Sequence, residues 1–407
     1  MKLGYKKLGD YIQLVDERNR NLEVETLLGV SIRKVLMPSI ANTIGTDMST
    51  YKIIRKNQFA YGTVTSRNGD KISIALLKEF NKALVSQIYL VFEVIDETVV
   101  LPDYLMMWFR RPEFDRYARF KSHGSARETF DWAEMLETEL PIPSLEKQKE
   151  LIDEYEAVEN RIQLNKKLCA TLEETAQTIY KHWFEDFEFP DENGKPYQSS
   201  GGEMVVCEEL GKEIPRGWRV GKLEEIAKVK SGFAFKNGDW KKSGLPVIKI
   251  GSIFGNSIDI NNLDFVNKNT HIRKEYIATT DDIVIAMTGA TIGKIGIIPN
   301  FFTEYYINQR VGLFEFKNNL FKYFLYLILQ KDFIQYEIQN VGGDSAQANI
   351  SNKQIENFKI IIPDTHILVE FCTNIKIIVD KIQASKSQIQ KLEELKSLLL
   401  GKMAVKV

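Results

Sequence analysis

Apolar side chains recur along residues 144–187 at steps that alternate between three and four residues. This spacing is the a/d pattern of a coiled-coil helix, and Pro143 marks the place where the helix begins. A helix of roughly 40 residues extends about 60 Å at 1.5 Å per residue, which is too long for one helix of a compact domain. It therefore needs a partner helix. The seam positions are Tyr155, Val158, Ile162, Asn165, Cys169, Leu172, Ala176, Ile179 and Trp183.

The C-terminal segment, residues 364–407, carries the same pattern at an offset of 220 residues. Both seams are broken by a polar residue at the matching place, Asn165 and Ser385, and such a residue fixes helix register at some cost in stability. Two unrelated amphipathic helices would not share period, phase and polar break, so we predict that the two helices pair. The second seam is Ile375, Ile378, Ile382, Ser385, Ile389, Leu392, Lys396, Leu399 and Met403.

The repeat extends beyond the helices into the rest of the chain. Ser125-Ala126 corresponds to Ser345-Ala346 at the same offset, and Lys7-Leu8-Gly9-Asp10 corresponds to Lys222-Leu223-Glu224-Glu225 at 215 residues. The chain is therefore an internal duplication in which each globular half is followed by a long helix. The predicted segments are a first globular domain at 1–143, a central helix at 144–187, a turn-rich linker at 188–210, a second globular domain at 211–363 and a C-terminal helix at 364–407.

Both globular halves mix short strands with short helices, which predicts an α+β class of fold. Runs rich in β-branched and aromatic residues predict strands, and apolar residues at helical spacing predict helices. The expected strands are 60–64, 88–94, 246–250, 282–286, 294–298 and 311–316, and the expected short helices are 102–109 and 323–329.

The overall charge does not indicate nucleic-acid binding, because the 407 residues carry a formal net charge of only −1. The basic residues are nevertheless clustered: residues 110–127 hold six Lys or Arg and two acids, interleaved with aromatic side chains. Three widely separated cysteines, Cys169, Cys207 and Cys372, indicate buried or idle thiols in a reducing compartment. The N-terminal residues form no apolar signal region and no apolar run approaches 18 residues, so we expect a cytoplasmic protein without a membrane anchor.

Two stretches of the sequence weakly resemble catalytic patterns. Residues 289–294 (GATIGK) resemble a phosphate-binding loop, but the glycines are one residue too close and Ile295 replaces the Ser or Thr that would hold Mg²⁺. Asp282, Glu315 and Lys317 could imitate a metal-dependent nuclease, which needs carboxylates that converge on one spot. The four histidines show no metal-ligand spacing, and no glycine-rich dinucleotide fingerprint is present.

The remaining candidates are residues suited to nucleic acid. Basic side chains track phosphates, backbone N–H groups of a Gly-rich turn can do the same, and Asn, Gln and Arg read base edges. The alternative for each basic cluster is a solvated surface, but one cluster per half favours a DNA-binding role. The candidates are Arg67, Asn68, Arg110, Arg111, Arg116, Arg119, Lys121 and Arg127 in the first half, and Lys236, Lys249, Thr288, Thr291, Lys294, Gln347 and Asn349 in the second.

The order of segments and several short motifs resemble the specificity (S) subunit of type I restriction–modification systems, over nearly the whole chain. Each motif is weak alone, and together they are specific. They are residues 140–148 (LPIPSLEKQ), 172–177 (LEETAQ), 180–184 (YKHWF), 215–218 (PRGW), 285–294 (IAMTGATIGK) and 343–350 (GDSAQANI).

The resemblance implies two target-recognition domains that each read half of a bipartite, asymmetric site on double-stranded DNA. It implies that the two helices pack antiparallel as a spacer and that two methyltransferase (M) subunits dock around them and bring the S-adenosylmethionine. A restriction/translocase (R) subunit would join this complex. The chain itself would hold no cofactor or metal and would catalyse nothing.

Four features depart from the family pattern. Residues 363–367 (PDTHI) replace the usual start of the second helix, Lys396 interrupts its seam, and it ends without the Trp-Phe of the first copy. The first half also lacks the TGATIGK stretch of the second, which indicates two different domain subtypes. Two other functions stay open at this point: a stand-alone nuclease that uses Asp282, Glu315 and Lys317, and a coiled-coil interaction protein with no role on DNA.

Overall fold

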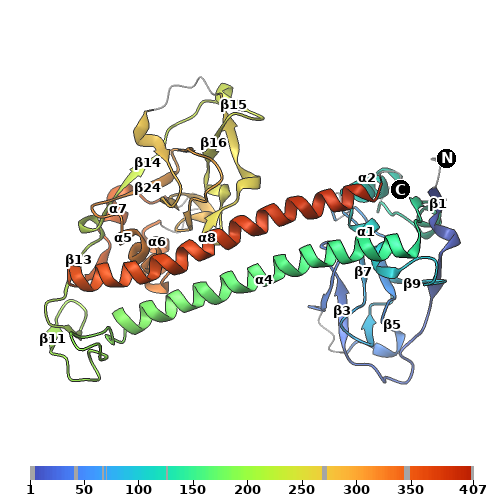
Figure 1. The fold of residues 1–407 in the computed structure, drawn as a ribbon, viewed down its shortest axis with the longest axis horizontal. Coiled ribbons are helices and arrows are strands. Elements are labelled where there is room, and N and C mark those ends of the chain that lie inside the picture. Colours follow the sequence, from blue (N-terminus) through green and yellow to red (C-terminus); the bar gives the residue numbers. More distant parts are fainter. Residues whose placement is uncertain are drawn as a thin grey trace. The chain divides into compact units, whose positions relative to one another are not determined.

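The structure, a computed structural model, describes residues 5–40, 45–66, 68–69, 71–124, 127–267, 273–342 and 349–404. The chain divides into two units, Met1–Gln163 with Lys391–Val407 (unit 1) and Leu164–Gln390 (unit 2). The division falls inside both long helices, α4 (Leu145–Phe184) and α8 (Thr365–Lys402), which lie within the predicted ranges (Figure 1). Each long helix therefore contributes one part to each unit, whereas the sequence analysis assigned the helices to segments of their own.

Unit 1 contains two four-stranded sheets and three short helices. One sheet has the order β2–β9–β6–β7 and the other has the order β4–β3–β8–β5. The strands are β2 (Ile12–Val15), β3 (Leu27–Val30), β4 (Leu36–Pro38), β5 (Lys52–Arg55), β6 (Phe59–Gly62), β7 (Ser73–Leu76), β8 (Lys82–Val85) and β9 (Leu90–Val94). The helices are α1 (Pro102–Arg110), α2 (Pro112–Lys121) and α3 (Trp132–Leu136).

The core of unit 1 joins its globular part to the long helices. Phe59 of β6 and Phe92 of β9 stack with their ring centroids 4.7 Å apart, and Phe109 of α1 meets both rings edge-on. The same apolar cluster includes Leu151, Ile152 and Tyr155 near the start of α4, and Leu400 and Met403 near the end of α8. Burial of apolar surface is the main force that stabilises such a cluster, so this end of the helix pair belongs to the unit 1 core.

Unit 2 contains a six-stranded sheet, β14–β24–β21–β22–β18–β17, and a five-stranded sheet, β15–β19–β16–β23–β20. Its core holds Tyr180 and Phe184 of α4, Phe324 of α5 and Phe371 of α8 in mutual ring contact. The elements are β14 (Ala227–Ser231), β15 (Trp240–Lys241), β16 (Leu245–Ile248), β17 (Ile253–Phe254), β18 (Ser257–Ile258), β19 (Asp264–Val266), β20 (Ile277–Ala278), β21 (Ile283–Ala286), β22 (Ile295–Ile297), β23 (Tyr305–Ile307), β24 (Val311–Phe316), α5 (Phe321–Ile328), α6 (Asp332–Gly342) and α7 (Asn352–Glu356).

The duplication is visible in how each repeat closes on itself. In unit 1, β1 (Tyr5–Lys7) pairs antiparallel with β10 (Glu139–Pro141), and in unit 2, β13 (Arg219–Lys222) pairs antiparallel with β25 (Lys359–Ile362). The backbone N–H of Leu8 donates to Thr138 O at 2.8 Å, and the N–H of Leu223 donates to Phe358 O at 2.9 Å. A separate hairpin, β11 (Met204–Cys207) with β12 (Lys212–Pro215), follows α4. The predicted class, two repeated α+β domains with long helices, is confirmed.

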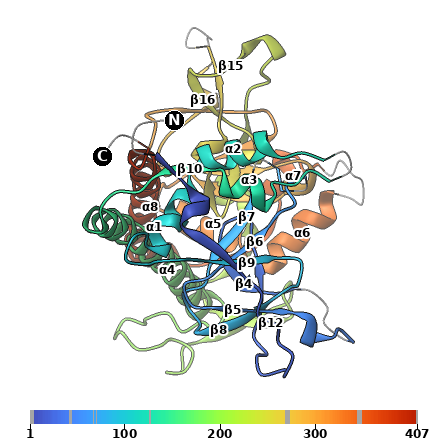
Figure 2. The ribbon, with the colours of Figure 1, turned by 90° about the vertical axis from the view of Figure 1, so that its right-hand side faces the viewer.

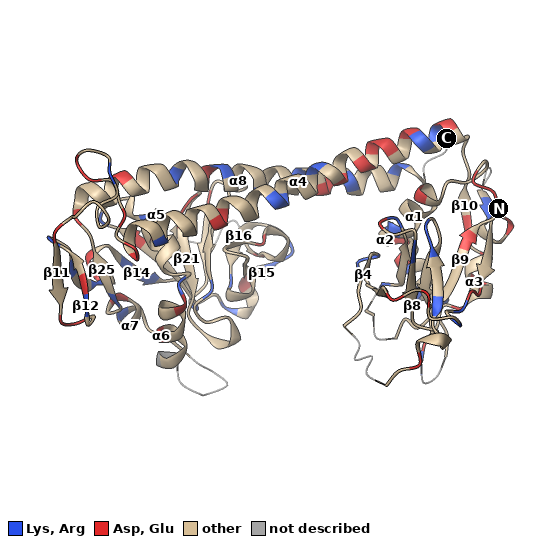
Figure 3. Ribbon diagram, turned by 90° about the horizontal axis from the view of Figure 1, so that it is seen from below, with Lys and Arg blue, Asp and Glu red and all other residues tan. Residues whose placement is uncertain are grey.

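Within each unit the two long helices run antiparallel. In unit 1, Lys396 Nζ lies 3.2 Å from Glu159 Oε2, and in unit 2, Lys386 Nζ lies 3.0 Å from Glu173 Oε1. In each unit the chain runs in opposite directions along α4 and α8 (Figure 1). Charged residues of both signs follow each other along the outer faces of the two helices (Figure 3).

The predicted seam is largely buried. Its buried members are Tyr155, Val158, Ile162, Asn165, Cys169, Ala176, Trp183, Ile375, Ile382, Ser385, Leu399 and Met403, and its half-buried members are Leu172, Ile179, Ile378, Ile389, Leu392 and Lys396. Lys396, which interrupts the seam, is held at its edge by the Glu159 carboxylate. Of the helices in the described part of the chain, none combines the length and the apolar composition needed to cross a membrane.

Candidate nucleic-acid interface

Helix α2 carries three of the predicted basic residues of the first half. Pro112 occupies its first position, acids lie in its first turn and bases in its last, an order that suits the helix dipole. Arg116 pairs with Glu113 at 3.2 Å, Arg119 pairs with Glu128, and Lys121 reaches Glu134 at 3.3 Å. Glu134 belongs to α3, and the α2 and α3 ribbons are neighbours in Figure 2. Exposed ion pairs of this kind contribute little to stability, so these cations can exchange a carboxylate for a phosphate.

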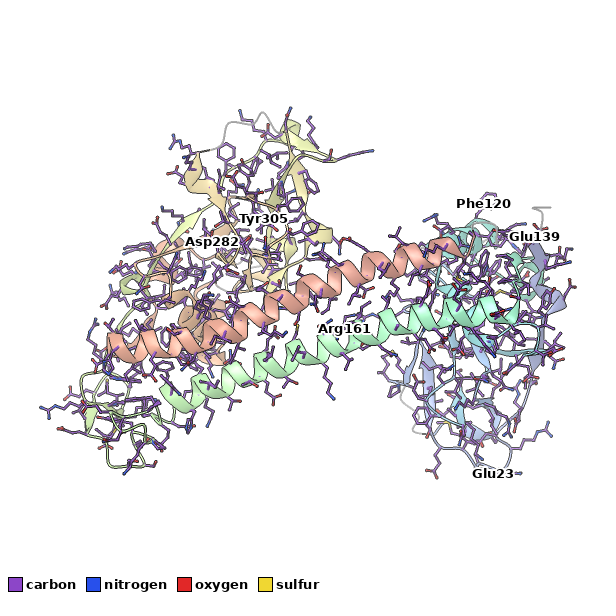
Figure 4. All side chains as sticks on the ribbon, in the orientation of Figure 1. Glu23, Phe120, Glu139, Arg161, Asp282 and Tyr305 are labelled. Carbon is purple, nitrogen blue, oxygen red and sulfur yellow. The ribbon has the colours of Figure 1, made fainter. Side chains whose placement is uncertain are left out.

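Two further exposed side chains belong to this surface. Phe120 of α2 is 84% exposed (Figure 4), and Arg127 is exposed and makes no ion pair within the described part of the chain. An exposed aromatic ring among cations can stack on a base or insert beside it. We use the name α2 patch for Arg116, Arg119, Phe120, Lys121 and Arg127.

Two of the predicted phosphate contacts are turned inward. The side chain of Arg111 is buried, with its guanidinium carbon 4.2 Å from the Trp108 ring centroid, and burial lowers the pKa of the guanidinium. Arg110 is half-buried and its Nη1 lies 3.4 Å from Tyr155 Oη on α4. The six bases of residues 110–127 therefore do not form one surface. The Arg111 cation is withdrawn from solvent, and Arg110 faces Tyr155 and not the α2 patch.

Asn68, which was predicted to read a base, makes hydrogen bonds within the first half. Its Nδ2 donates to Val64 O at 2.9 Å and to Ser73 Oγ at 3.2 Å, so the side-chain amide is occupied by its own loop. Arg67 lies outside the described residues.

In unit 2 the lysines between residues 236 and 249 surround a group of aromatic rings. Lys249 Nζ lies 3.5 Å from the Trp240 ring centroid and 2.9 Å from Asp264 Oδ2. Lys236 is exposed, and so are its neighbours Lys241 and Lys242. The rings of Phe233, Phe235, Trp240 and Tyr276 form a chain of contacts with centroids 5.1–5.6 Å apart. Cations beside aromatic rings can bind a nucleic-acid strand. The lysines were predicted from the sequence, but the aromatic cluster beside them was not.

The Gly-rich stretch forms a tight turn between β21 and β22. Gly289 and Gly293 have φ of +69° and +82°, and a Cβ at Gly293 would lie 2.9 Å from the Gln335 side chain of α6. The turn presents Lys294, which is exposed, together with half-buried Thr288 and Thr291. Thr288 bridges Asn349 through the backbone, so Asn349 lies beside the turn. Gln347 lies outside the described residues.

A cavity of about 360 Å³ opens beside this turn. Its polar wall is a run of side-chain amides: Asn256 Nδ2 donates to Gln330 Oε1 at 2.8 Å, and Gln335 Nε2 donates to Gly293 O at 3.1 Å. Phe254, 72% exposed, stands at its edge. The sequence analysis missed these residues because they come from three separated segments and no local motif connects them.

The two carboxylates of the nuclease alternative are engaged by different partners. Asp282 accepts hydrogen bonds from Thr279 at its own turn, whereas Glu315 pairs with Lys230 at 2.8 Å (Figure 4 labels Asp282). In the described ranges no three His, Cys, Asp or Glu side chains gather in a way that could hold a metal ion. The nuclease alternative is not supported.

Comparison with known proteins agrees with this picture. A family model described as the type I restriction modification DNA specificity domain matches residues 36–174 and 215–396, one match in each repeat. The chain is 27% identical over 317 residues to the type I restriction enzyme MjaIX specificity subunit of Methanocaldococcus jannaschii, covering 76% of this chain and 70% of that protein. It is 23% identical over 427 residues to the HindI specificity subunit of Haemophilus influenzae, covering 91% and 90%.

A solved structure shares the fold. The S subunit of a type I restriction–modification system from M. genitalium aligns with a TM-score of 0.61 and 16% identity, covering 100% of this chain and 99% of that one. The relatives are named specificity subunits, in agreement with the prediction that the chain itself is not an enzyme. Because the family model covers more than half of the sequence, this chain belongs to the family of type I restriction–modification DNA specificity proteins.

Proposed function

We propose that this chain reads a bipartite, asymmetric target on double-stranded DNA for a type I restriction–modification complex, with one half-site per unit. The proposal rests on one observation: the two units repeat the same order of elements, but the corresponding helices expose different side chains. Helix α2 and helix α6 occupy equivalent places after α1 and α5, yet α2 presents Arg116, Arg119 and Lys121 while α6 begins at Asp332 and exposes Phe333 and Tyr336. Two surfaces of different chemistry on one framework suit two different half-sites.

The long helices supply the proposed assembly surface. Their seam is buried, and their outer faces carry exposed charges of both signs, which suit specific docking of partner subunits. We propose that two M subunits bind these helices and bring S-adenosylmethionine, and that an R subunit joins the complex in the cytoplasm. The α2 patch of unit 1, with the Lys294 turn and the Lys236–Lys249 cluster of unit 2, provides the phosphate contacts.

The decisive experiment is methylome sequencing of a strain that carries this chain with its cognate M subunit. We expect one methylation motif made of two unlike half-sites separated by an unspecified gap. A palindromic motif would contradict the assignment of different half-sites to the two units.

A binding measurement separates this function from a coiled-coil protein without a role on DNA. Affinity for duplex DNA should fall steeply as salt rises, because phosphate contacts release counterions, and addition of the M subunit should strengthen it. Binding that is absent with and without the M subunit would leave only the interaction-protein alternative.

A further inference from the structure

Unit 1 contains a cavity that the DNA-reading role does not use. It has a volume of about 440 Å³, within the range of small-molecule sites. It lies where α1, α2 and the β1–β10 pair meet, and Ala404 at the end of α8 contributes to its wall. The apolar part of the lining is aromatic: Trp108, Phe114 and Tyr117.

Two hydrogen-bond donors in this lining have no partner. Trp108 and Arg111 are 5% and 6% exposed, and Trp108 Nε1 and Arg111 Nε make no hydrogen bond to any part of the described chain. The two groups are neighbours, since the guanidinium carbon of Arg111 lies 4.2 Å from the Trp108 ring centroid. A buried donor without an acceptor costs free energy, and an unpaired atom of this kind in a native structure needs an explanation.

The electrostatics of the cavity favour an acceptor with negative charge. The Arg111 cation is desolvated, and the carboxylate nearest to it, Glu113 Oε2, stands 3.4 Å from Nη2 and leaves Nε unused. Glu113 and Phe114 belong to the first turn of α2, where the helix dipole is positive.

The acids at the cavity rim do not cancel this preference. Glu113 also pairs with Arg116, and Glu137 pairs with Lys7 at 2.6 Å. Glu139, labelled in Figure 4, stands opposite Lys7 in the β1–β10 register. Glu113 therefore has a cation of its own, Glu137 and Glu139 share Lys7, and the buried Nε of Arg111 has no acceptor in the described chain.

We propose that this cavity binds a small carboxylic acid with an apolar body. The carboxylate accepts from Trp108 Nε1–H and Arg111 Nε–H, and the apolar body lies against Phe114 and Tyr117. A carboxylate has two oxygens and can satisfy both donors at once. None of the lining residues belongs to the α2 patch or to the helix seam, so the proposed site does not depend on the proposed DNA function.

The test follows the indole N–H signals of the full-length protein labelled with ¹⁵N-tryptophan, which contains five tryptophans. The Trp108 signal is identified by its loss in Trp108→Phe. Titration with phenylacetate should shift this signal saturably, with a Kd on the order of 1 mM as expected for a small fragment. Phenylacetamide has the same body without the charge and should bind about tenfold more weakly.

Two variants test whether phenylacetate binds in this cavity. Arg111→Gln should lower the affinity for phenylacetate at least about tenfold. The matched control Arg20→Gln, an exposed arginine of unit 1 outside the cavity lining, should leave it unchanged. No shift of the Trp108 signal at 20-fold the expected Kd, or equal binding of the acid and the amide, would overturn the proposal. The comparison of acid with amide uses the unaltered protein, so it decides the matter even if Arg111→Gln does not fold.

Discussion

At the scale of single residues, the α2 patch offers a clean test of phosphate contacts. Arg119→Ala or Lys121→Ala should weaken binding to every duplex alike and lower the salt slope by about one, because a phosphate contact carries no sequence information. Lys7→Ala removes another solvent-exposed, paired cation of unit 1 that lies outside the patch, and it serves as the control. Fluorescence anisotropy over a salt series measures both quantities, and a loss confined to the cognate sequence would contradict the assignment.

A second residue prediction concerns base recognition in unit 2. Asn349 is exposed and bridges the Gly-rich turn, and Gln347 precedes it by two residues. Replacing Gln347 or Asn349 with Ala should relax one base position of the second half-site, since side-chain amides read adenine. The methylation motif of each variant strain reports the change. An unchanged motif and affinity in Gln347→Ala would show that this assignment is wrong.

Arg111 shows where sequence reasoning stops at this scale. A run of six bases among aromatics predicts a basic surface, and four of these bases, Arg116, Arg119, Lys121 and Arg127, lie partly or fully in solvent. Arg111 is buried beside Trp108 of α1, which lies three residues earlier in the chain. The guanidinium of Arg111 lies over the Trp108 ring. The i, i+3 spacing of an aromatic residue and Arg was the available signal. Which way the pair faces is set by packing, which the sequence does not reveal.

At the scale of elements, the helix seam can be tested with two neighbouring substitutions on α4. Ile162 is fully buried and Leu164 is 62% exposed. Ile162→Asp places an unpaired charge in the seam, at a cost of several kcal/mol, and should abolish co-purification of the M subunit. Leu164→Asp adds the same charge to the outer face and should leave the seam intact. Normal co-purification with Ile162→Asp would argue against the seam.

The start of α4 makes a second prediction. Gln148 is fully buried: it accepts from Leu101 N–H at 2.9 Å and donates to Val99 O and Pro143 O at 2.8 and 2.9 Å. Leu368 stands at the equivalent position of α8 and is buried in an apolar cluster. Gln148→Leu should therefore destabilise unit 1 by at least about 2 kcal/mol, because it leaves buried backbone groups unpaired.

Urea denaturation measures this loss of stability. Gln163→Leu, at an exposed position of α4, is the matched control and should change the midpoint little. Equal midpoints for the two variants would mean that the three hydrogen bonds of Gln148 do not stabilise unit 1.

The elements also show which patterns a sequence reveals. The long helices were predictable because nine seam positions keep the alternating spacing of three and four residues. Strands such as β15, β17 and β20 have only two residues each and are too short to show a period. Helices α3 and α7 have five residues each and were missed, although Asp131 and Ser351 cap them with side-chain oxygens. Short elements are specified by tertiary contacts more than by local pattern.

At the scale of the whole molecule, we predict that helix length sets the gap between half-sites. Inserting one heptad after Leu172 and another after Leu392 keeps both seams in phase and adds about 10 Å of helix. One base pair occupies about 3.4 Å, so the gap could grow by up to roughly 3 base pairs while both half-sites stay unchanged. Methylome sequencing measures the gap, and an active variant with the original gap would refute the idea.

The division of the chain has a consequence for its synthesis. Unit 2 is one uninterrupted stretch of residues 164–390, but the unit 1 core also needs Leu400 and Met403 from the far end of α8. Domains commonly fold in order as they leave the ribosome. Here unit 2 can complete its fold first, whereas unit 1 keeps part of its apolar core exposed until the end of α8 has been synthesised. A premature stop just after Gln390 would therefore spare the later unit and damage the earlier one.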